Sequence, residues 1–394
     1  MDSDTRGAAD KLYFRGLDSL RFLAALFVVL GHIPMNQSAV GLPDHHAGVA
    51  FYRGISAVCF FFTLSGFLIT YLLLEEHRRT GGIQVRSFYL RRVCRIWPLY
   101  FLIVFAGLIA YNALFPRLGI QYPVAYSPGL ALLLYVLMLP NLMNSLYTVG
   151  GLLNPLWSIG VEEQFYLAWA PAVKRFARVL PYVCAAVLAV SFAVFVINEL
   201  GGLGAAAPWL KRFIGQIKLH FMAAGALCAW CLHRHRERLL ALPVFSSRIV
   251  QLALFALLLD FYLLYGIRWG LFLDEAVQLV LYSWIIVTVA ANPRNMIPVE
   301  NRAFDYLGKI SYGLYMYHMF AVYLTSATFK ATTWWQGRPA LYIAAYYAMA
   351  LGLTALAAHL SYRWFELPFL RLKDRKWSLP AAAPRAGVEA VPAP

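Results

Sequence analysis

The chain has 394 residues, of which 61% are hydrophobic and only 13% are charged, and its formal net charge is +15. This composition excludes a soluble globular domain, because several apolar runs reach the length of about 20 residues that a membrane-spanning helix needs. It does not indicate a nucleic-acid partner, since excess Lys and Arg in a membrane protein normally lie in cytoplasmic loops near anionic headgroups. We therefore expect an all-α, polytopic transmembrane helical bundle, with the lipid bilayer of the plasma (inner) membrane as its surroundings.

Apolar runs predict about ten spans, which follow a polar leader at residues 1–10. The predicted spans cover about 17–35, 54–74, 97–115, 157–173, 181–199, 213–232, 248–266, 271–291, 309–329 and 339–361. Between the third and fourth spans, the apolar stretch 129–139 is too short to cross the membrane and ends at Leu139-Pro140-Asn141. We therefore predict a re-entrant segment there, a transmembrane domain over residues 11–370, and a basic, then Pro/Ala-rich tail over residues 371–394.

The distribution of Lys and Arg predicts the orientation. With ten spans, the loops on one side contain most of the basic residues, including the cluster at 78–95, Lys174, Arg175 and the tail. Cytoplasmic loops carry this excess in membrane proteins. We therefore expect both termini in the cytoplasm, and residues 129–147 on the outer side.

The first span contains two ionisable residues, Arg21 and His32. Eleven positions at about 100° per residue are three turns plus about 20°, so both lie on one stripe, about 16 Å apart along the axis. Ionisable groups inside a span usually face the bundle interior or a wet cavity. The alternatives are that Arg21 snorkels to the interface and that His32 is a hydrogen-bonded structural residue.

Helix rise places Glu162 at the level of His32. His32 lies about 22 Å from the cytoplasmic start of span 1, whereas Glu162 lies about 8 Å below the outer face in the inward-running span 4. An imidazole near a carboxylate is the usual make-up of a general base and its orienting group, so we predict that both are catalytic and line one cavity. A polar entry turn near the interface is the alternative reading of Glu162.

Further candidates surround these two residues. The guanidinium groups of Arg91, Arg92 and Arg95, just before span 3, suit the binding of a polyphosphate, although they also fit a positive-inside anchor. Ser65 and Tyr315 lie inside spans, and His318 is predicted below the level of His32. Asn141, at the break of the re-entrant segment, and Trp157 complete the predicted cavity or acceptor residues. No metal site is predicted, since Cys228-Ala-Trp-Cys231 alone is a weak signal.

Five linked motifs resemble the signature of the membrane acyltransferase-3 family. They are Arg21 and His32 with ten residues between them, Phe60-Phe-Phe-Thr-Leu-Ser-Gly-Phe-Leu-Ile69, Arg91-Arg-x-x-Arg95-Ile-x-Pro98, Trp157-Ser-x-x-x-Glu162-Glu-Gln-Phe-Tyr166 and Ile310-Ser-Tyr-Gly-Leu-Tyr-x-Tyr-His318. The resemblance covers about residues 11–370 in the expected order. Some members carry a fused C-terminal SGNH esterase-like domain, and we expect any such partner of this chain to be a separate protein.

The resemblance implies an integral membrane O-acyltransferase. Members move acyl groups, commonly acetyl, from cytoplasmic acyl-coenzyme A to hydroxyls of sugars and related acceptors. It implies acyl-CoA as co-substrate with no permanently bound cofactor, His32 and Glu162 as catalytic residues, and donor binding by Arg21 with the arginine cluster. The residues leave open a transporter or channel that uses the Arg21/His32 line as a conduit, and a lipid-binding scaffold. They also leave open direct transfer or an acyl-histidine relay.

Overall fold

The computed structural model describes residues 14, 16–43, 54–120, 122, 124–202, 207–261, 269–297, 299 and 301–377. The predicted leader, the final residues of the seventh predicted span and the tail beyond Trp377 lie outside these ranges. The helices are α1 (Leu17–Ala39), α2 (Gly54–Thr80), α3 (Val85–Ile109), α4 (Phe115–Arg117), α5 (Pro128–Val136), α6 (Pro140–Leu146), α7 (Leu156–Phe176), α8 (Leu180–Glu199), α9 (Pro208–Gln216), α10 (Leu219–Ala241), α11 (Pro243–Ser246), α12 (Arg248–Leu259), α13 (Leu271–Ala291), α14 (Arg302–Lys309), α15 (Ser311–Lys330), α16 (Pro339–Ser361) and α17 (Leu367–Trp377). Two π-helical turns, Ala110–Leu114 and Tyr362–Glu366, join α3 to α4 and α16 to α17.

The all-α membrane fold is confirmed for the described part of the chain. Six helical segments there are long and apolar enough to cross a membrane: α1, α2, α3 with its continuation to Arg117, α8, α13, and α16 with its continuation to Trp377. The predicted spans 157–173, 213–232 and 309–329 correspond to α7, α10 and α15, which have 21, 23 and 20 residues but carry more polar side chains. The described part of the predicted span 248–266 contains the shorter apolar helix α12. The chain is a multi-pass membrane protein, and the number of ten crossings stays a prediction.

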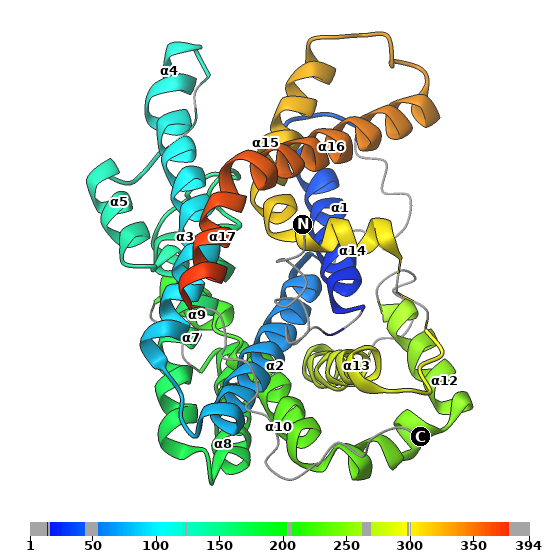
Figure 1. Cartoon of the computed structure of the whole chain (residues 1–394). Helices are drawn as coiled ribbons and strands as arrows, with labels where there is room; N and C mark the ends of the chain where they lie inside the picture. Colours follow the sequence, from blue (N-terminus) through cyan, green and yellow to red (C-terminus); the bar gives the residue numbers. More distant parts are fainter. Residues whose placement is uncertain are drawn as a thin grey trace, which may run out of the picture.

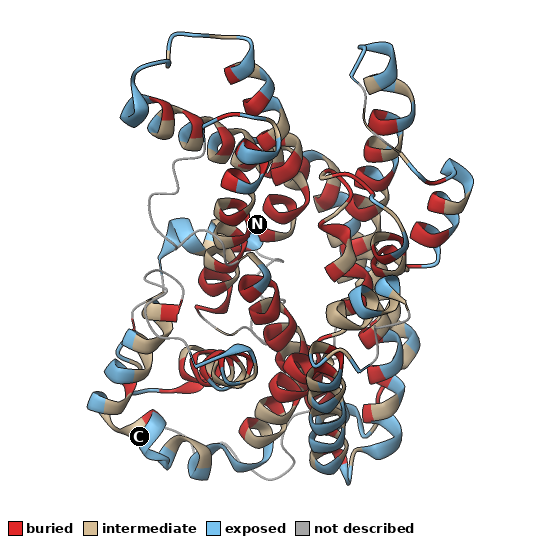
Figure 2. Ribbon diagram, turned by 180° about the vertical axis from the view of Figure 1, so that it is seen from behind, coloured by how far each residue is buried: buried red, intermediate tan, exposed pale blue. Residues whose placement is uncertain are grey.

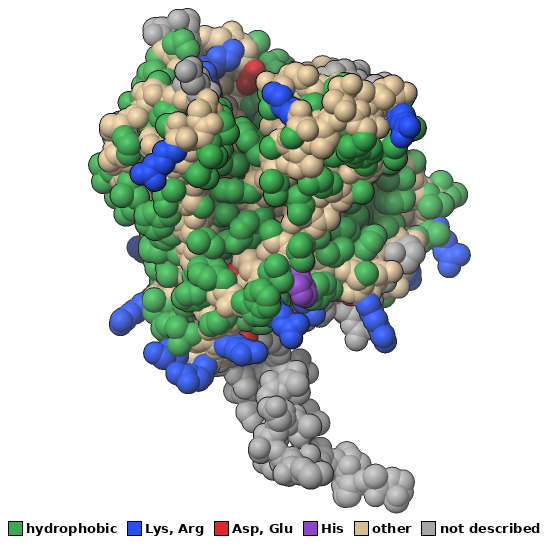
Figure 3. Space-filling model, turned by 90° about the horizontal axis from the view of Figure 1, so that it is seen from above, with side chains coloured by type: hydrophobic (Ala, Val, Ile, Leu, Met, Phe, Trp, Pro, Cys, Tyr) green, Lys and Arg blue, Asp and Glu red, His purple; other side chains and the backbone are tan. Residues whose placement is uncertain are grey.

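Buried residues concentrate in the central helices, and exposed residues lie at the periphery (Figure 2). In α2, 72% of the apolar window is buried inside the protein, whereas in α8 the share is 17%. Helix α2 is therefore a core helix, and α8 offers most of its apolar surface to lipid. Figure 3 shows hydrophobic side chains over most of one face, with Lys and Arg along its lower edge and a few near its upper edge. This arrangement is typical of a surface that crosses a bilayer.

The core is held together by the close approach of α2 and α10. A Cβ atom added at Gly66 would lie 1.9 Å from the carbonyl oxygen of Met222, and one added at Gly225 would lie 1.9 Å from that of Thr63. Small residues at such crossings let two helix backbones pack directly in a membrane. This contact fixes the side of α2 that carries Phe61 and Ser65.

Replacing Gly225 by alanine is expected to separate α2 from α10 and to lower the melting temperature of the detergent-solubilised protein by several degrees. The reason is that the Cβ atom overlaps a backbone carbonyl that cannot rotate away. Gly352→Ala in α16 is the matched control, because a Cβ atom there meets nothing within 4 Å. Equal melting temperatures for Gly225→Ala and Gly352→Ala would show that the α2–α10 contact is unimportant.

The region between α4 and α7 contains the predicted break. Helices α5 and α6 are separated at Met138, whose φ of 56° is unusual for a residue with a side chain. Pro140 then begins α6 and packs against Gly160 of α7, where an added Cβ atom would lie 2.6 Å from the proline ring. Two short helices match the predicted interruption, and the re-entrant position of the segment stays a prediction.

Two short helices bring the C-terminal third of the chain against the start of α1 and α3. Helix α14 contacts α1 through Gly308, where a Cβ atom would lie 1.9 Å from the carbonyl oxygen of Asp18. After α16, the π-helical turn redirects the chain so that α17 runs beside α3 (Figure 1). Helix α17 continues to Trp377, past residue 371 where the predicted tail begins. These contacts close one side of the cavity described next.

Candidate active site

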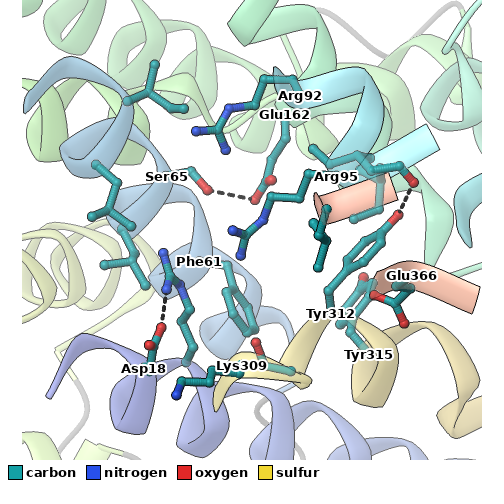
Figure 4. Close-up of a pocket in the computed structure, with 18 of the residues that line it drawn as sticks. Asp18, Phe61, Ser65, Arg92, Arg95, Glu162, Lys309, Tyr312, Tyr315 and Glu366 are labelled. Carbon is teal, nitrogen blue, oxygen red and sulfur yellow. Dashed lines mark hydrogen bonds and ion pairs between the residues drawn. The ribbon is translucent and has the colours of Figure 1, made fainter. Parts of the chain in front are cut away.

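A cavity of about 470 Å³ lies between α1, α2, α3, α7, α14, α15 and α17 (Figure 4). Its walls are apolar along α2 and polar where α1, α3, α7 and α17 face it. The polar and charged lining residues are Asp18, Arg21, Ser65, Arg92, Arg95, Ser158, Glu162, Tyr166, Lys309, Ser311, Tyr312, Tyr315, Tyr362, Glu366, Arg371, Lys373 and Asp374. This size and this mixture of apolar walls and convergent polar groups are typical of a ligand pocket.

Arg92 and Arg95 are the strongest positive feature of the cavity. Among the described residues neither forms an ion pair, and the Nε atom of Arg92 is buried without a hydrogen-bond partner. The Arg92 guanidinium lies 5.7 Å from the ring centroids of both Phe88 and Tyr166, which hold it in place. Unpaired, fixed guanidinium groups in a cavity are suited to bind an anion.

Arg91 does not line the cavity, which corrects the prediction for the third arginine of the motif. Its Nη2 atom lies 2.9 Å from the Oε2 atom of Glu76, and its Nη1 atom donates to the carbonyl oxygen of Trp377 at 3.2 Å. Arg91 and Arg92 are about 100° apart around the helix axis, so they point to different neighbours. The side chain of Arg91 therefore joins α3 to α2 and α17.

Other cations of the cavity include one that was predicted and three that were missed. Arg21 lines the cavity as predicted, and it is paired with Asp18 on the preceding turn of α1. Lys309, Arg371 and Lys373 also line it, with Lys373 paired to Asp374. The basic run at 371–376 was a signal for Arg371 and Lys373, but no local pattern shows that α17 returns to α3. No such signal marks Lys309.

Glu162 lies in the cavity wall, and its carboxylate is held by two hydroxyl groups. Ser65 donates to its Oε1 atom at 3.2 Å, and Tyr166 donates to its Oε2 atom at 2.8 Å. Figure 4 shows Glu162, Arg92 and Arg95 directed toward the same space. No hydrogen bond joins Glu162 to His32 within the described part of the chain. The predicted pairing of these two residues is therefore replaced by a Ser65–Glu162–Tyr166 arrangement.

Two aromatic residues lie side by side in the cavity wall. The rings of Phe61 and Tyr315 both line it, with centroids 6.4 Å apart. The Tyr315 hydroxyl donates to the carbonyl oxygen of Pro155 at 2.7 Å and lies 2.7 Å from the Ser158 hydroxyl. These contacts fix Tyr315 in the cavity wall, and its place in the lining agrees with the sequence prediction.

Neither His32 nor His318 lines the cavity, which corrects the prediction that both would do so, and the predicted cavity does not continue from Glu162 to His32. The ring of His32 packs against that of His318, with centroids 4.9 Å apart, and the His318 ring lies 5.7 Å from the ring of Tyr315. The two histidines are neighbours, although we predicted His318 below the level of His32. Depth counted from residue numbers assumes straight parallel helices, whereas the α14–α15 break at Ile310 starts α15 already inside the bundle.

Both histidines have a defined tautomer. The Nδ1 atom of His32 lies 2.8 Å from the carbonyl oxygen of Val28, and that of His318 lies 2.5 Å from the carbonyl oxygen of Tyr315. Because a carbonyl only accepts, each Nδ1 carries the proton and each neutral ring keeps its lone pair on Nε2. The Nε2 atom of His318 is buried without a hydrogen-bond partner in the described structure. This leaves an imidazole pair with two basic nitrogen atoms free for proton transfer.

Asn141 and Trp157 lie outside the cavity. The Asn141 amide forms two hydrogen bonds with the amide of Gln164, at 3.3 Å and 2.9 Å, so it joins α6 to α7 instead of facing an acceptor. The Trp157 ring packs edge-on against Phe62 at 6.1 Å. Neither side chain lines the cavity, which corrects both predictions. Their partners, Gln164 on α7 and Phe62 on α2, could not be identified from the spacing of residues in the sequence. No group of three or more His, Cys, Asp or Glu side chains suited to a metal ion occurs within the described ranges.

Comparison with known proteins decides the family. The model of the acyltransferase-3 family, described as an acyltransferase domain, matches residues 14–359. The chain belongs to this family. The match includes the cavity arginines of α3, Glu162 and both histidines, and it ends just before the π-helical turn that leads into α17.

Similar proteins include O-acetyltransferase OatA of Staphylococcus aureus strain NCTC 8325 / PS 47, which is 25% identical over 374 residues, covering 90% of this chain. OatA of strain COL gives the same identity and coverage. The chain spans 57% of the length of these relatives. No solved structure matches the chain.

Proposed function

We propose that the protein transfers an acyl group, preferably acetyl, from cytoplasmic acyl-CoA to a hydroxyl of a sugar-containing or related acceptor. The observation that carries this proposal is the cavity with the unpaired guanidinium groups of Arg92 and Arg95. The names of the similar proteins support oxygen as the acetylated atom. We place the protein in the plasma (inner) membrane with both termini in the cytoplasm, so that this cavity faces the donor.

The donor phosphates bind to the cations of the cavity. Arg92 and Arg95 contribute two guanidinium groups, and Lys309 and Arg371 contribute charge from α14 and α17. Hydrogen bonds between charged groups are roughly twice as strong as neutral ones, which favours a polyphosphate over neutral ligands. Arg21, with its charge compensated by Asp18, contributes less to affinity and more to the shape of the wall.

The chemistry takes place at His32, which lies behind Tyr315 and His318 as seen from the cavity. His32 removes the proton from the acceptor hydroxyl through Nε2 as the oxygen attacks the thioester carbonyl. The carbon–sulfur bond then breaks, and the thiolate of coenzyme A takes up the proton from His32. His318, with its free Nε2 atom beside His32, stabilises the imidazolium that forms.

Tyr315 lies in the cavity wall, with His318 and then His32 behind it, so transfer requires the Tyr315 side chain to move. Glu162 binds the hydroxyl groups of Ser65 and Tyr166 and keeps a carboxylate opposite Arg92 and Arg95. In this position it limits how deeply the donor phosphates enter. A transport conduit along the line of Arg21 and His32 would need a lining that includes both residues. The cavity includes Arg21 but not His32, so no observation favours a conduit over an enzyme.

The test uses the purified protein in lipid nanodiscs with acetyl-CoA. Free thiol should appear with an acceptor extract from cells that make the natural product, and the product should gain the mass of one acetyl group. A protein that binds no coenzyme A, or that moves solutes without consuming thioester, would contradict the proposal. Cells with and without the protein, compared by mass spectrometry, identify the acceptor.

Labelling of single cysteines is expected to confirm the orientation. In a variant that lacks the five native cysteines, Thr148→Cys should react with an impermeant maleimide added to intact cells, whereas Lys174→Cys should react only after lysis. Both side chains are exposed in the structure, so access depends on the side of the membrane alone. The reverse pattern would place the cavity mouth outside the cell and exclude a cytoplasmic donor.

A further inference from the structure

Helices α1 and α15 are joined a second time beyond the imidazole pair. Asn36 follows His32 by one turn of α1, and Ser326 follows His318 by about two turns of α15. The Ser326 hydroxyl donates to the Oδ1 atom of Asn36 at 2.6 Å, and both side chains are buried. The two helices are therefore in contact at the histidine rings, and again at a hydrogen bond about 6 to 12 Å farther along their axes.

A third helix completes this second contact. The hydroxyl of Tyr346 in α16 lies 2.6 Å from the Oγ atom of Ser326. Ser326 has a single hydroxyl proton, which it gives to Asn36 because a carboxamide oxygen only accepts. Tyr346 is therefore the donor to Ser326. Asn36, Ser326 and Tyr346 form a buried chain of two short hydrogen bonds across α1, α15 and α16, which we call the three-helix clamp.

Further contacts hold α16 in place beside this clamp. The Gln37 amide of α1 donates to the Tyr342 hydroxyl of α16 at 2.9 Å. The ring of Phe329 in α15 packs against those of Tyr342 and Tyr346, with centroids 5.4 Å and 5.2 Å apart. Polar and aromatic contacts thus bind α16 to both of the helices that carry the histidines.

Apolar packing connects the three-helix clamp to the histidines. One cluster of buried side chains contains Ile33, the residue after His32, together with Val322, one turn after His318, and Tyr346. Interiors packed at this density transmit small displacements, because side chains cannot move independently of their neighbours. A rotation of α15 about its axis would therefore break the clamp and move His318 relative to His32 at the same time.

The imidazole pair depends on such a contact between helices. The Nδ1 atom of His32 is bonded to the carbonyl oxygen of Val28, and that of His318 to the carbonyl oxygen of Tyr315. Each bond fixes a ring to its own helix only. The distance of 4.9 Å between the two ring centroids is therefore set by how α1 and α15 pack against each other.

We propose that Asn36, Ser326 and Tyr346 are positioning residues for acyl transfer. They hold α1 and α15 in the rotation that places His318 against His32. The inference rests on the proposed function, in which His318 stabilises the imidazolium of His32, and it adds residues that determine the rate without touching donor, acceptor or reacting atoms. None of the three lines the cavity described above, so the clamp acts on turnover and not on donor binding.

The experiment measures kcat and the KM for acetyl-CoA in nanodiscs, by thiol release with a fixed amount of the acceptor extract. Ser326→Ala removes both hydrogen bonds of the clamp and should lower kcat about tenfold, because a misplacement of about 1 Å can cost about 10²-fold in rate. The KM for acetyl-CoA should change less than twofold. The melting temperature of each variant shows whether it is folded.

A double-variant cycle separates positioning from a general structural role. If the clamp acts by placing His318, Ser326→Ala should lower kcat by less than about twofold in a protein that already carries His318→Ala. Independent effects on the fold would instead multiply the two losses in rate, because the free-energy changes of independent sites add. Multiplied losses would reject the positioning role.

Two further variants complete the experiment. Thr328→Ala removes an α15 hydroxyl that donates to the carbonyl oxygen of Leu324 in the same helix at 3.0 Å, and it should leave kcat and KM unchanged. Tyr346→Phe keeps the ring and removes its hydroxyl, so it tests the clamp if Ser326→Ala fails to fold, and it should also lower kcat. Wild-type kcat in a well-folded Ser326→Ala or Tyr346→Phe protein would overturn the inference. Absence of thiol release by the wild-type protein would instead reject the proposed function.

Discussion

Replacement of His32 by alanine is expected to lower the acyl-transfer rate by about 10³-fold, because a positioned general base contributes about 10²–10⁴-fold. The bond from Nδ1 to the carbonyl oxygen of Val28 fixes the proton there and leaves Nε2 as the base. Affinity for coenzyme A should change less than twofold, since His32 does not line the cavity of Arg92 and Arg95, where we propose that the donor binds. Product formation is followed by thiol release and mass spectrometry, and donor binding by calorimetry.

His77→Ala provides the matched control, because His77 is an exposed histidine on α2 outside the cavity. Its turnover should equal that of the wild-type protein. His318→Ala should also lose turnover, by a smaller factor, because it removes the neighbour of the imidazolium and not the base itself. Normal turnover by a well-folded His32→Ala protein would rule out His32 as the base.

The double variant Arg92→Gln/Arg95→Gln is expected to raise the donor KM by about 100-fold. Each charge-assisted hydrogen bond to a phosphate contributes about 1.5–3 kcal/mol, and about 1.4 kcal/mol corresponds to a factor of ten. The salt dependence of donor binding should weaken at the same time, because fewer phosphate charges are neutralised. The fold should be preserved, since neither side chain forms an ion pair with another described residue.

Two comparisons make this result specific. Arg86→Gln/Arg175→Gln removes the same charge from exposed positions and should leave the donor KM unchanged. Arg91→Gln should lower the melting temperature without raising the donor KM, because it leaves the buried carboxylate of Glu76 without its partner. If the cavity double variant binds coenzyme A as the wild-type protein does, the arginines serve only to orient the helix in the membrane.

The sequence alone determined the features that depend on short stretches of chain. Apolar run length predicted the positions of the longer helices, because a bilayer of fixed thickness requires spans of a minimum length. These helices are α1, α2, α3, α7, α8, α10, α12, α13, α15 and α16. Pro140 predicted the interruption between α5 and α6, since proline lacks the N–H group that a continuous helix needs. Helix periodicity and the five motifs together identified Arg21, Arg92, Arg95, Ser65, Glu162 and Tyr315, all of which line one cavity.

Only the tertiary structure decided which of these residues face each other. Arg91 pairs with Glu76 outside the cavity, and Asn141 pairs with Gln164. Glu162, which was predicted to orient His32, accepts a hydrogen bond from Ser65 instead. The return of α17 to α3 adds Arg371 and Lys373 to the cavity lining, and the break at Ile310 places His318 against His32. The physical reason is that a side chain pairs with the group that the packing of distant helices brings within a few ångströms. The spacing of residues along one helix determines the direction and depth of a side chain, but it does not determine which residue of another helix lies next to it.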